Sequence, residues 1–169
     1  HAVDHSGARL GEFKLKKSKN KDWEDLASFR LDDKSYLMVA DIGDNNARRA
    51  DRTLYFVEEP APEARGEEKR DWRVNFTYPD GPRDAESAAV DSDAQLALIL
   101  SKRDLPPRLY SLPLRPENDE TITANLLGTI TSLQKPSRQE VALAPKNKSW
   151  YWQPVGMDIS ADNLAAVIL

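Results

Sequence analysis

Short runs of apolar residues, separated by polar turns, form the main pattern along the chain. The runs are rich in β-branched and aromatic residues and are bounded by Pro, Gly, Asp, Asn and Ser, which is typical of β-strands. Apolar residues do not recur at helical spacing over several turns. The pattern predicts an all-β protein with antiparallel strands at positions 9–15, 24–30, 36–41, 53–57, 72–78, 86–90, 95–101, 108–112, 126–132, 156–160 and 164–169.

Two hairpins follow from their turn residues. If Asp32-Asp33-Lys34 forms the first turn, Asp25 lies opposite Asp41, and apolar residues occupy both faces of the hairpin. The second hairpin, with its turn at 91–94, places 88–90 against 98–100. Strands that are apolar on both faces are covered on both sides in a folded protein. We therefore expect each hairpin to lie between other layers.

The first hairpin and the second belong to a diverged repeat. Asp22-Trp-Glu-Asp-Leu-Ala27 matches Asp84-Ala-Glu-Ser-Ala-Ala89, and each is followed by a turn, an apolar strand and two outer strands. Four antiparallel strands with apolar inner members describe a β-propeller blade. The predicted domain is thus one β-propeller, with a partial blade at about 1–19, blades at about 22–79 and 84–133, and a partial blade at about 150–169.

Closed propellers contain about four to eight blades, so we expect a partial propeller whose remainder is missing from this chain. A β-sandwich built from the same strands is the alternative fold. The polar segments 60–71 and 134–149 are expected to be loops, insertions or disordered segments.

Composition narrows the classes of partner. With 40% hydrophobic and 31% charged residues, the chain is too apolar for a disordered protein. No apolar run approaches the roughly 20 residues of a membrane helix, so we expect no membrane span. A net charge of −4 argues against nucleic-acid binding. The lysine-rich segment 14–21 is interpreted as a solvated strand edge, with anion binding as the alternative.

The chemistry available to a site is also limited. The sequence has no Cys, which excludes disulfides, thiolate nucleophiles and cysteine zinc sites. Its two His residues are His1 and His5, so a histidine-dependent triad would have to use the first five residues. Site chemistry is left to 28 Asp and Glu, 24 Lys and Arg, and the polar neutral residues.

Acidic residues gather at one end of the first hairpin. In the expected register, Asp22, Glu24, Asp25, Asp41, Asp44 and Asn45 crowd together there. Facing carboxylates repel, and a cluster of oxygen donors without His or Cys favours Ca²⁺, or secondarily Mg²⁺, over zinc, copper or iron. The alternative is structural: residues 41–46 form an Asx-rich turn, and Asp25 accepts bonds from backbone amides.

The second unit combines acidic with basic residues. Glu86 occupies the matching position, but the facing strand leads into Lys102 and Arg103. Glu86 and Lys102 are expected to form an ion pair, or Lys102 and Arg103 could hold an anionic ligand beside a metal. The arginines after the acidic loop, Arg52 among them, are expected mainly to pair with acids such as Asp44.

Four motifs support a resemblance to a known group: Asn20-Lys-Asp-Trp-Glu-Asp-Leu-Ala27, Val39-Ala-Asp-Ile-Gly-Asp-Asn45, Tyr55-Phe-Val-Glu-Glu-Pro60, and Tyr78-Pro-Asp-Gly-Pro-Arg-Asp-Ala-Glu-Ser87 followed by Ser101-Lys102. On these residues the chain resembles a group of largely uncharacterised bacterial β-propeller proteins, commonly exported. It is more loosely similar to calcium-dependent six-bladed propellers of the gluconolactonase and β-propeller phytase kind. The resemblance implies a periplasmic or extracellular location and a calcium site over the central channel, with ligands from Glu24, Asp25, Asp41, Asp44, Asn45 and Glu86.

The expected function is divalent-cation binding, with Ca²⁺ as the ion and no organic cofactor. A small-molecule or protein ligand would be recognised at the carboxylate-lined end, with Lys102 and Arg103 as ligand-binding residues. The alternative is a calcium-dependent hydrolase of a phosphoester or lactone, in which the ion polarises the substrate oxygen and a carboxylate orients water. A purely structural module with solvated acids is the third possibility.

Overall fold

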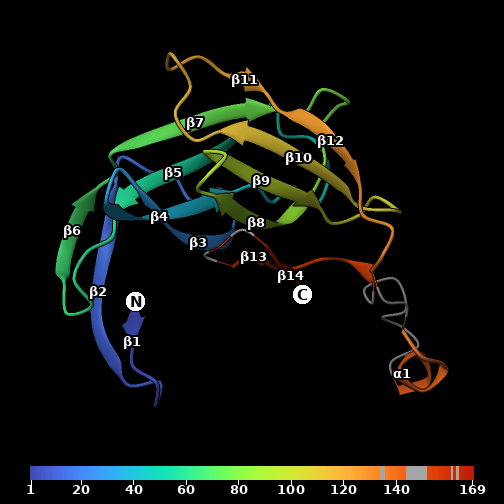
Figure 1. Ribbon diagram of the computed structural model, residues 1–169, viewed down its shortest axis with the longest axis horizontal. Coiled ribbons are helices and arrows are strands. Elements are labelled where there is room, and N and C mark those ends of the chain that lie inside the picture. Colours follow the sequence, from blue (N-terminus) through green and yellow to red (C-terminus); the bar gives the residue numbers. More distant parts are fainter. Residues whose placement is uncertain (134–135, 144–151, 161, 163) are drawn as a thin grey trace.

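The computed structural model describes residues 1–133, 136–143, 152–160, 162 and 164–169. The protein is all-β, with 49% of its residues in strands and 4% in helix, and its several sheets are not closed into a ring. Figure 1 shows the sheets packed side by side, with the β1–β2 segment extending away from them. Each strand predicted from the apolar runs overlaps a strand of the structure.

The first sheet has five strands in the order β11-β7-β5-β4-β3. They are β3 (Trp23–Leu31), β4 (Lys34–Asp41), β5 (Arg52–Glu58), β7 (Trp72–Thr77) and β11 (Ile122–Thr123). All neighbours are antiparallel except β11, which pairs in parallel with β7. The short β11 lies in the connection between β10 and β12 of the second sheet, and it places that connection at the outer edge of the first sheet.

The predicted register of the first hairpin is wrong by one position. Asp32 and Asp33 have φ values of 50° and 61°, and Leu31 pairs with Lys34, so the turn has two residues rather than three. Asp25 therefore lies opposite Ala40 and not opposite Asp41. A β-bulge between Trp23 and Asp25 then pairs Trp23 with Asp41.

The second sheet has four strands in the order β12-β10-β9-β8. They are β8 (Ala85–Asp91), β9 (Leu96–Ser101), β10 (Arg108–Pro113) and β12 (Asn125–Thr129). The predicted hairpin is present, but Asp91 pairs with Leu96, so its turn is 92–95 rather than 91–94. Residues 88–90 therefore lie against 97–99 and not against 98–100, with Ala88 opposite Ile99. A bulge between Ala85 and Ser87 repeats the bulge of the first sheet.

The core lies between these two sheets. It contains one face of the first hairpin, including Phe29 and Met38, and one face of the second, including Ala88 and Ile99. The other face of the second sheet is covered by a two-stranded sheet, β13 (Met157–Ile159) and β14 (Ala166–Ile168). The edge strands β3, β8 and β13 are thereby neighbours in series.

A separate three-stranded sheet is formed by β1 (Ala2–Val3), β2 (Arg9–Lys16) and β6 (Arg65–Lys69). β6 lies in the segment that was expected to be a loop or disordered, and it pairs in parallel with β2. Lys16 Nζ and Glu67 Oε2 are 2.5 Å apart across this pair. The lysine-rich stretch is thus partly a paired strand, and Lys16 within it is matched by Glu67.

The first hairpin is not covered on both faces, contrary to the expectation from its apolar pattern. On its outer face Leu26 is 59% exposed, and Leu37 and Val39 are half-buried among the described residues.

The helix α1 (Arg138–Leu143) begins with a capping box between Ser137 and Glu140. The predicted segments 134–149 and 150–169 fall in part, at 134–135, 144–151, 161 and 163, outside the described residues.

Candidate functional site

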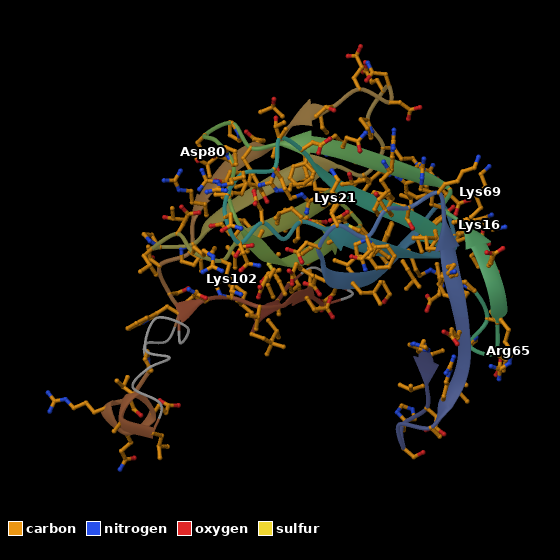
Figure 2. All side chains as sticks on the ribbon, turned by 180° about the vertical axis from the view of Figure 1, so that it is seen from behind. Lys16, Lys21, Arg65, Lys69, Asp80 and Lys102 are labelled. Carbon is orange, nitrogen blue, oxygen red and sulfur yellow. The ribbon has the colours of Figure 1, made fainter. Side chains whose placement is uncertain are left out.

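The candidate site lies where β3 and β8 begin, beside the loop that follows β4. Figure 2 labels Lys102 at the edge of the sheets, on the opposite side of the molecule from Lys16 and Lys69 on the β2–β6 sheet. All the residues predicted as metal ligands or ligand-binding residues come from this region or from strand β3 next to it. Their bonding partners divide them into two sets. The members of the first set bond to backbone amides or to other side chains that join the strands, and they are Asp25, Asp41, Asp44, Asn45 and Arg103. The second set is Glu24, Glu86 and Lys102.

Asp41 has both carboxylate oxygens occupied. Oδ1 accepts hydrogen bonds from the amide of Asp22 at 3.0 Å and pairs with Nη1 of Arg49 at 2.9 Å. Oδ2 accepts a bond from the amide of Lys21 at 3.3 Å. The side chain is 1% exposed. Asp41 therefore fixes the entry into β3 and has no oxygen directed toward solvent.

Asp44 is the centre of a second closed network. Its carboxylate accepts bonds from the amides of Arg48 at 3.0 Å and Arg49 at 2.8 Å, and from the guanidinium of Arg52 at 2.6 Å. Burial alone would raise the pKa of Asp44, but these amide bonds and the Arg52 charge lower it. The expected pairing of Arg52 with Asp44 is present, and both side chains are buried.

The two sheets are joined through Asp84. The Asp44 amide donates to Asp84 Oδ1 at 2.8 Å, and Arg103 Nε lies 2.8 Å from Asp84 Oδ2. Arg103 also donates to Oδ1 of Asn45 at 2.5 Å. Arg103 and Asn45, predicted as a ligand-binding residue and a metal ligand, therefore bond to each other and to this link between the sheets.

Asp25 links three strands that are distant in the sequence. Its Oδ2 accepts bonds from the amides of Ala88 at 2.7 Å and Met157 at 3.4 Å, while Oδ1 accepts a bond from the amide of Leu26 at 2.9 Å. Burial raises the pKa of Asp25, and these amide bonds offset part of that effect. Asp25 therefore accepts hydrogen bonds from backbone amides, as the structural alternative to a metal ligand predicted.

Glu24 and Glu86 are different, because each occupies a β-bulge. Glu24 lies between Trp23 and Asp25, and Glu86 lies between Ala85 and Ser87, at matching positions of the two sheets. A bulge redirects its side chain away from the regular alternation of the strand. The two glutamates come close enough for the charge of Glu86 to act on Glu24.

The pKa of Glu24 is raised to about 7. Burial is the largest cause, followed by the negative charges of Glu86 and Asp22 and a hydrogen bond with Asp22. The carboxyl groups of Glu24 and Asp22 both lie over the backbone of Gly43, where any side chain would overlap them. The absence of a side chain at Gly43 therefore allows these carboxyl groups to share one space.

Lys102 supplies a positive charge beside Glu86. Its ammonium contacts Glu86 Oε1, with both side chains about five-sixths buried at 15% and 16% exposure. The ion pair expected between Glu86 and Lys102 is thus present. It leaves Glu24 and Asp22 without a cation among their hydrogen-bonded partners in the described residues.

The six predicted metal ligands do not form a single coordination shell. In the part of the chain that the structure describes, no group of three or more Asp, Glu or His side chains is arranged to hold a metal ion. The convergent acids are instead Asp22, Glu24 and Glu86, with Asp84 nearby. Asp22 and Asp84 are not among the six predicted ligands. Each lies two positions before one of the glutamates, in the Asp-x-Glu spacing that both repeats share, and this spacing was the sequence signal for them.

Two cavities flank the inner strands. A groove of about 510 Å³ lies beside Glu24 and Asp25 and continues along apolar side chains of β2, β3 and β4. A polar cavity of about 560 Å³ lies at the opposite ends of β3 and β8, near Asp32, Asp93 and Asp158. The sequence did not predict either cavity, since each depends on how separate sheets are spaced.

Comparison of the chain with protein-family models, with curated proteins and with solved structures gives no match. Within the described ranges, no helix reaches the length and apolarity that crossing a bilayer requires. The functional conclusion therefore depends on the geometry of the bulged glutamates and the residues around them.

Proposed function

We propose that this protein is a β-propeller domain that binds Ca²⁺ where β3 and β8 begin and recognises a small-molecule or protein ligand there. The observation that carries the proposal is the pair of β-bulges that hold Glu24 and Glu86 at matching positions, close enough for the charge of one to act on the other. Converging carboxylates repel, and a divalent cation relieves that repulsion.

The cation-binding set in this proposal is smaller than the sequence indicated. Glu24 and Glu86 remain, and Asp22 joins them through its position over Gly43. Carboxylate oxygens without His or Cys suit Ca²⁺. Bound there, Ca²⁺ would supply the positive charge that the cluster lacks. Asp25, Asp41, Asp44 and Asn45 act as supports that hold the two strand entries in place.

The basic residues beside the carboxylates give the proposed ligand site positive charge. Lys102 and Arg103 lie next to the carboxylates, and Arg103 remains about half exposed. They would pair with the anionic part of a ligand. Export to a calcium-rich compartment belongs to this proposal, because modules with affinities of about 0.1–1 mM for Ca²⁺ function outside cells.

The propeller part of the proposal is supported by the stacking of the sheets. Three sheets follow one another face to face, with the edge strands β3, β8 and β13 adjacent. A β-sandwich is built from two layers, whereas a propeller repeats the packing radially. The series of three layers favours the propeller.

Calorimetry and thermal unfolding with added Ca²⁺ test the ion. We expect a dissociation constant of about 0.1–1 mM and a stabilisation of roughly 1–3 kcal/mol at saturation. Glu24→Gln and Glu86→Gln should each weaken binding by at least about tenfold, because each removes one negative donor. Asp93→Asn, at the opposite ends of the strands, is the matched control and should bind as the native chain does. Absence of heat and of any melting shift would exclude the ion.

A hydrolase is the second candidate, and the raised pKa of Glu24 favours it specifically. A carboxyl group with a pKa of about 7 is suited to general acid–base catalysis near neutral pH. Lys102 would hold an anionic substrate group and Glu24 would orient water. Panels of lactones and phosphomonoesters, assayed with Ca²⁺, test this function. Because Glu24→Gln is also expected to weaken Ca²⁺ binding, the variant is assayed at Ca²⁺ concentrations shown by calorimetry to saturate it. Loss of turnover under those conditions would support catalysis, and absence of turnover in the native chain would leave binding as the function.

A further inference from the structure

A groove of about 510 Å³ lies between strand β2 and the outer face of the β3–β4 hairpin. Most of its lining is apolar: Phe13 and Leu15 come from β2, and Leu26, Leu37 and Val39 come from the hairpin. Leu26 is 59% exposed, so this face of the hairpin is open. Sites for small molecules have volumes of roughly 300–1,000 Å³ and mostly apolar walls. The groove therefore has the size and the lining of a small-molecule site.

Two carboxylates, Glu24 and Asp25, also line the groove, and neither is paired with a cation. In the part of the chain that the structure describes, no Lys, Arg or His lies within ion-pair distance of either one. Glu24 bonds to a third acid, Asp22, and Asp25 accepts bonds from backbone amides. The basic residue of the lining, His1, lies instead 3.9 Å from Glu12 of β2. The groove thus carries negative charge that the described residues do not neutralise.

Trp23 adds an aromatic wall beside these acids. The bulge between Trp23 and Asp25 changes the alternation of β3, so Trp23 and Leu26 both line the groove although they are three positions apart. The indole Nε1 donates to the carbonyl of Lys19 at 3.1 Å, and the ring centroid lies 6.4 Å from that of Tyr55. Trp23 is still 36% exposed. A fixed aromatic ring beside carboxylates is suited to an organic cation, because its π-electrons attract positive charge.

We propose that this groove binds an organic cation in which a protonated amine is attached to an apolar chain or ring. The amine lies at Glu24 and Asp25, and the apolar part lies along Leu26, Leu37 and Val39. A metal ion by itself would leave the apolar walls in water, and an uncharged hydrocarbon would leave the acids without a partner. A ligand that combines an ammonium group with an apolar body matches both parts of the groove.

The inference goes beyond the proposed Ca²⁺ site and does not depend on it, although the two share Glu24. An ammonium group and Ca²⁺ would occupy this carboxylate alternatively. EDTA separates the two cases, because it removes Ca²⁺ and leaves the amine free. The measurements are therefore made with EDTA at pH 8, which is above the pKa of Glu24 and below the pKa of an alkylammonium group.

Calorimetry on the native chain tests the class of ligand directly. Octylammonium, octanol and octanoate carry the same apolar chain and differ in charge. We expect octylammonium to bind at least about tenfold more tightly than octanol or octanoate, because only the cation is attracted by the carboxylates. The affinity should also rise about threefold to fourfold for each methylene added between hexylammonium and octylammonium, because the groove buries the chain.

Substitutions locate the two parts of the site. Glu24→Gln should weaken the binding of octylammonium by at least about tenfold and change that of octanol little, because it removes the charge and keeps the shape. Leu26→Ser should weaken the binding of both ligands, because it shortens the apolar wall. Leu127→Ser, at a leucine of β12 that is 51% exposed, is the matched control and should bind octylammonium as the native chain does.

Equal affinity for octylammonium and octanol would overturn the proposal, because the acids would then play no part in recognition. Absence of octylammonium binding, or affinity that neither Glu24→Gln nor Leu26→Ser lowers, would overturn it as well. The comparison of the three ligands uses the native chain, so it decides the matter even if circular dichroism shows that a variant does not fold. Ca²⁺ is titrated separately. Binding of octylammonium without binding of Ca²⁺ would exclude the proposed ion and leave this inference intact, and the reverse result would exclude this inference and leave the ion.

Discussion

Glu24 makes the stability of the protein depend on pH. Its pKa of about 7 in the folded chain lies above its ordinary value of 4.5, so the folded state binds more protons than the unfolded state between these values. Stability should therefore fall as pH rises through this window and level off above it. Glu24→Gln should remove the fall and be more stable than the native chain at pH 8 by on the order of 1 kcal/mol, after allowance for solvent screening.

Urea unfolding of both proteins at acidic, neutral and alkaline pH measures this difference. Near pH 4 the two should be almost equally stable, because the native carboxyl group is then largely protonated. Parallel stability curves for Glu24→Gln and the native chain would contradict the raised pKa. Excess Ca²⁺ should reduce the difference, because the ion favours the charged carboxylate.

Unlike the ionised Glu24 carboxylate, which lowers the stability of the folded chain, the Asp44–Arg52 ion pair stabilises it. Both side chains are buried, with exposures of 5% and 1%. Asp44→Ala should therefore cost about 3–5 kcal/mol in urea unfolding, because it leaves the buried Arg52 charge without its acidic partner, with carbonyl acceptors such as those of Arg49 and Arg83 remaining. Asp51→Ala, which removes a surface pair with Lys21, should cost less than about 1 kcal/mol. Equal losses in the two variants would show that Arg52 does not depend on Asp44.

At the scale of the elements, the first hairpin has a strained turn. Asp32 and Asp33 both have positive φ, and the second position of such a two-residue turn favours glycine. Asp33→Gly should therefore raise the free energy of unfolding by about 0.5–1 kcal/mol, because it relieves the left-handed strain. Thermal unfolding measures the gain. Asp33→Ala keeps the strain and is the control, and a gain in both variants would point to charge rather than conformation.

The sequence was sufficient to predict most of the strands but not all of their pairings. Apolar runs such as those of β5 and β9 are strands because their residues pack on two faces. The register failed because Lys34 belongs to a strand, and turn length alone decides which residues face each other. β6 was missed because its five residues are Arg65 to Lys69, with no apolar alternation, and its position depends on pairing with β2.

The candidate site also depends on strand pairing and backbone geometry that the sequence pattern does not contain. The sequence indicated that acidic residues gather in this region, and Asp41 ends β4, Asp44 lies in the loop that follows it, and Glu86 lies near the start of β8. It could not show which oxygens are already occupied by amides and guanidinium groups, because those partners depend on backbone geometry. The bulges that distinguish Glu24 and Glu86 likewise became visible only in the strand pairing.

At the scale of the whole molecule, stability should be uneven. β5 is buried from Arg52 to Val57 between two strands, whereas most of β6 is exposed on a thin outer sheet. Hydrogen exchange followed by mass spectrometry should show the slowest amides in β5, β8 and β9 and much faster amides in β2 and β6. Uniform protection across these strands would contradict this division into a firm centre and a looser N-terminal layer.

The contacts of Asp25 have a consequence for the order in which the chain folds during synthesis. Its carboxylate meets the Ala88 amide 63 positions later and the Met157 amide 132 positions later. A ribosome delivers residues from the N-terminus at about 5–20 per second, so several seconds separate the arrival of these two partners. The first two sheets can join around Asp25 while the chain is still growing, and the last hairpin then attaches to a surface that is already formed.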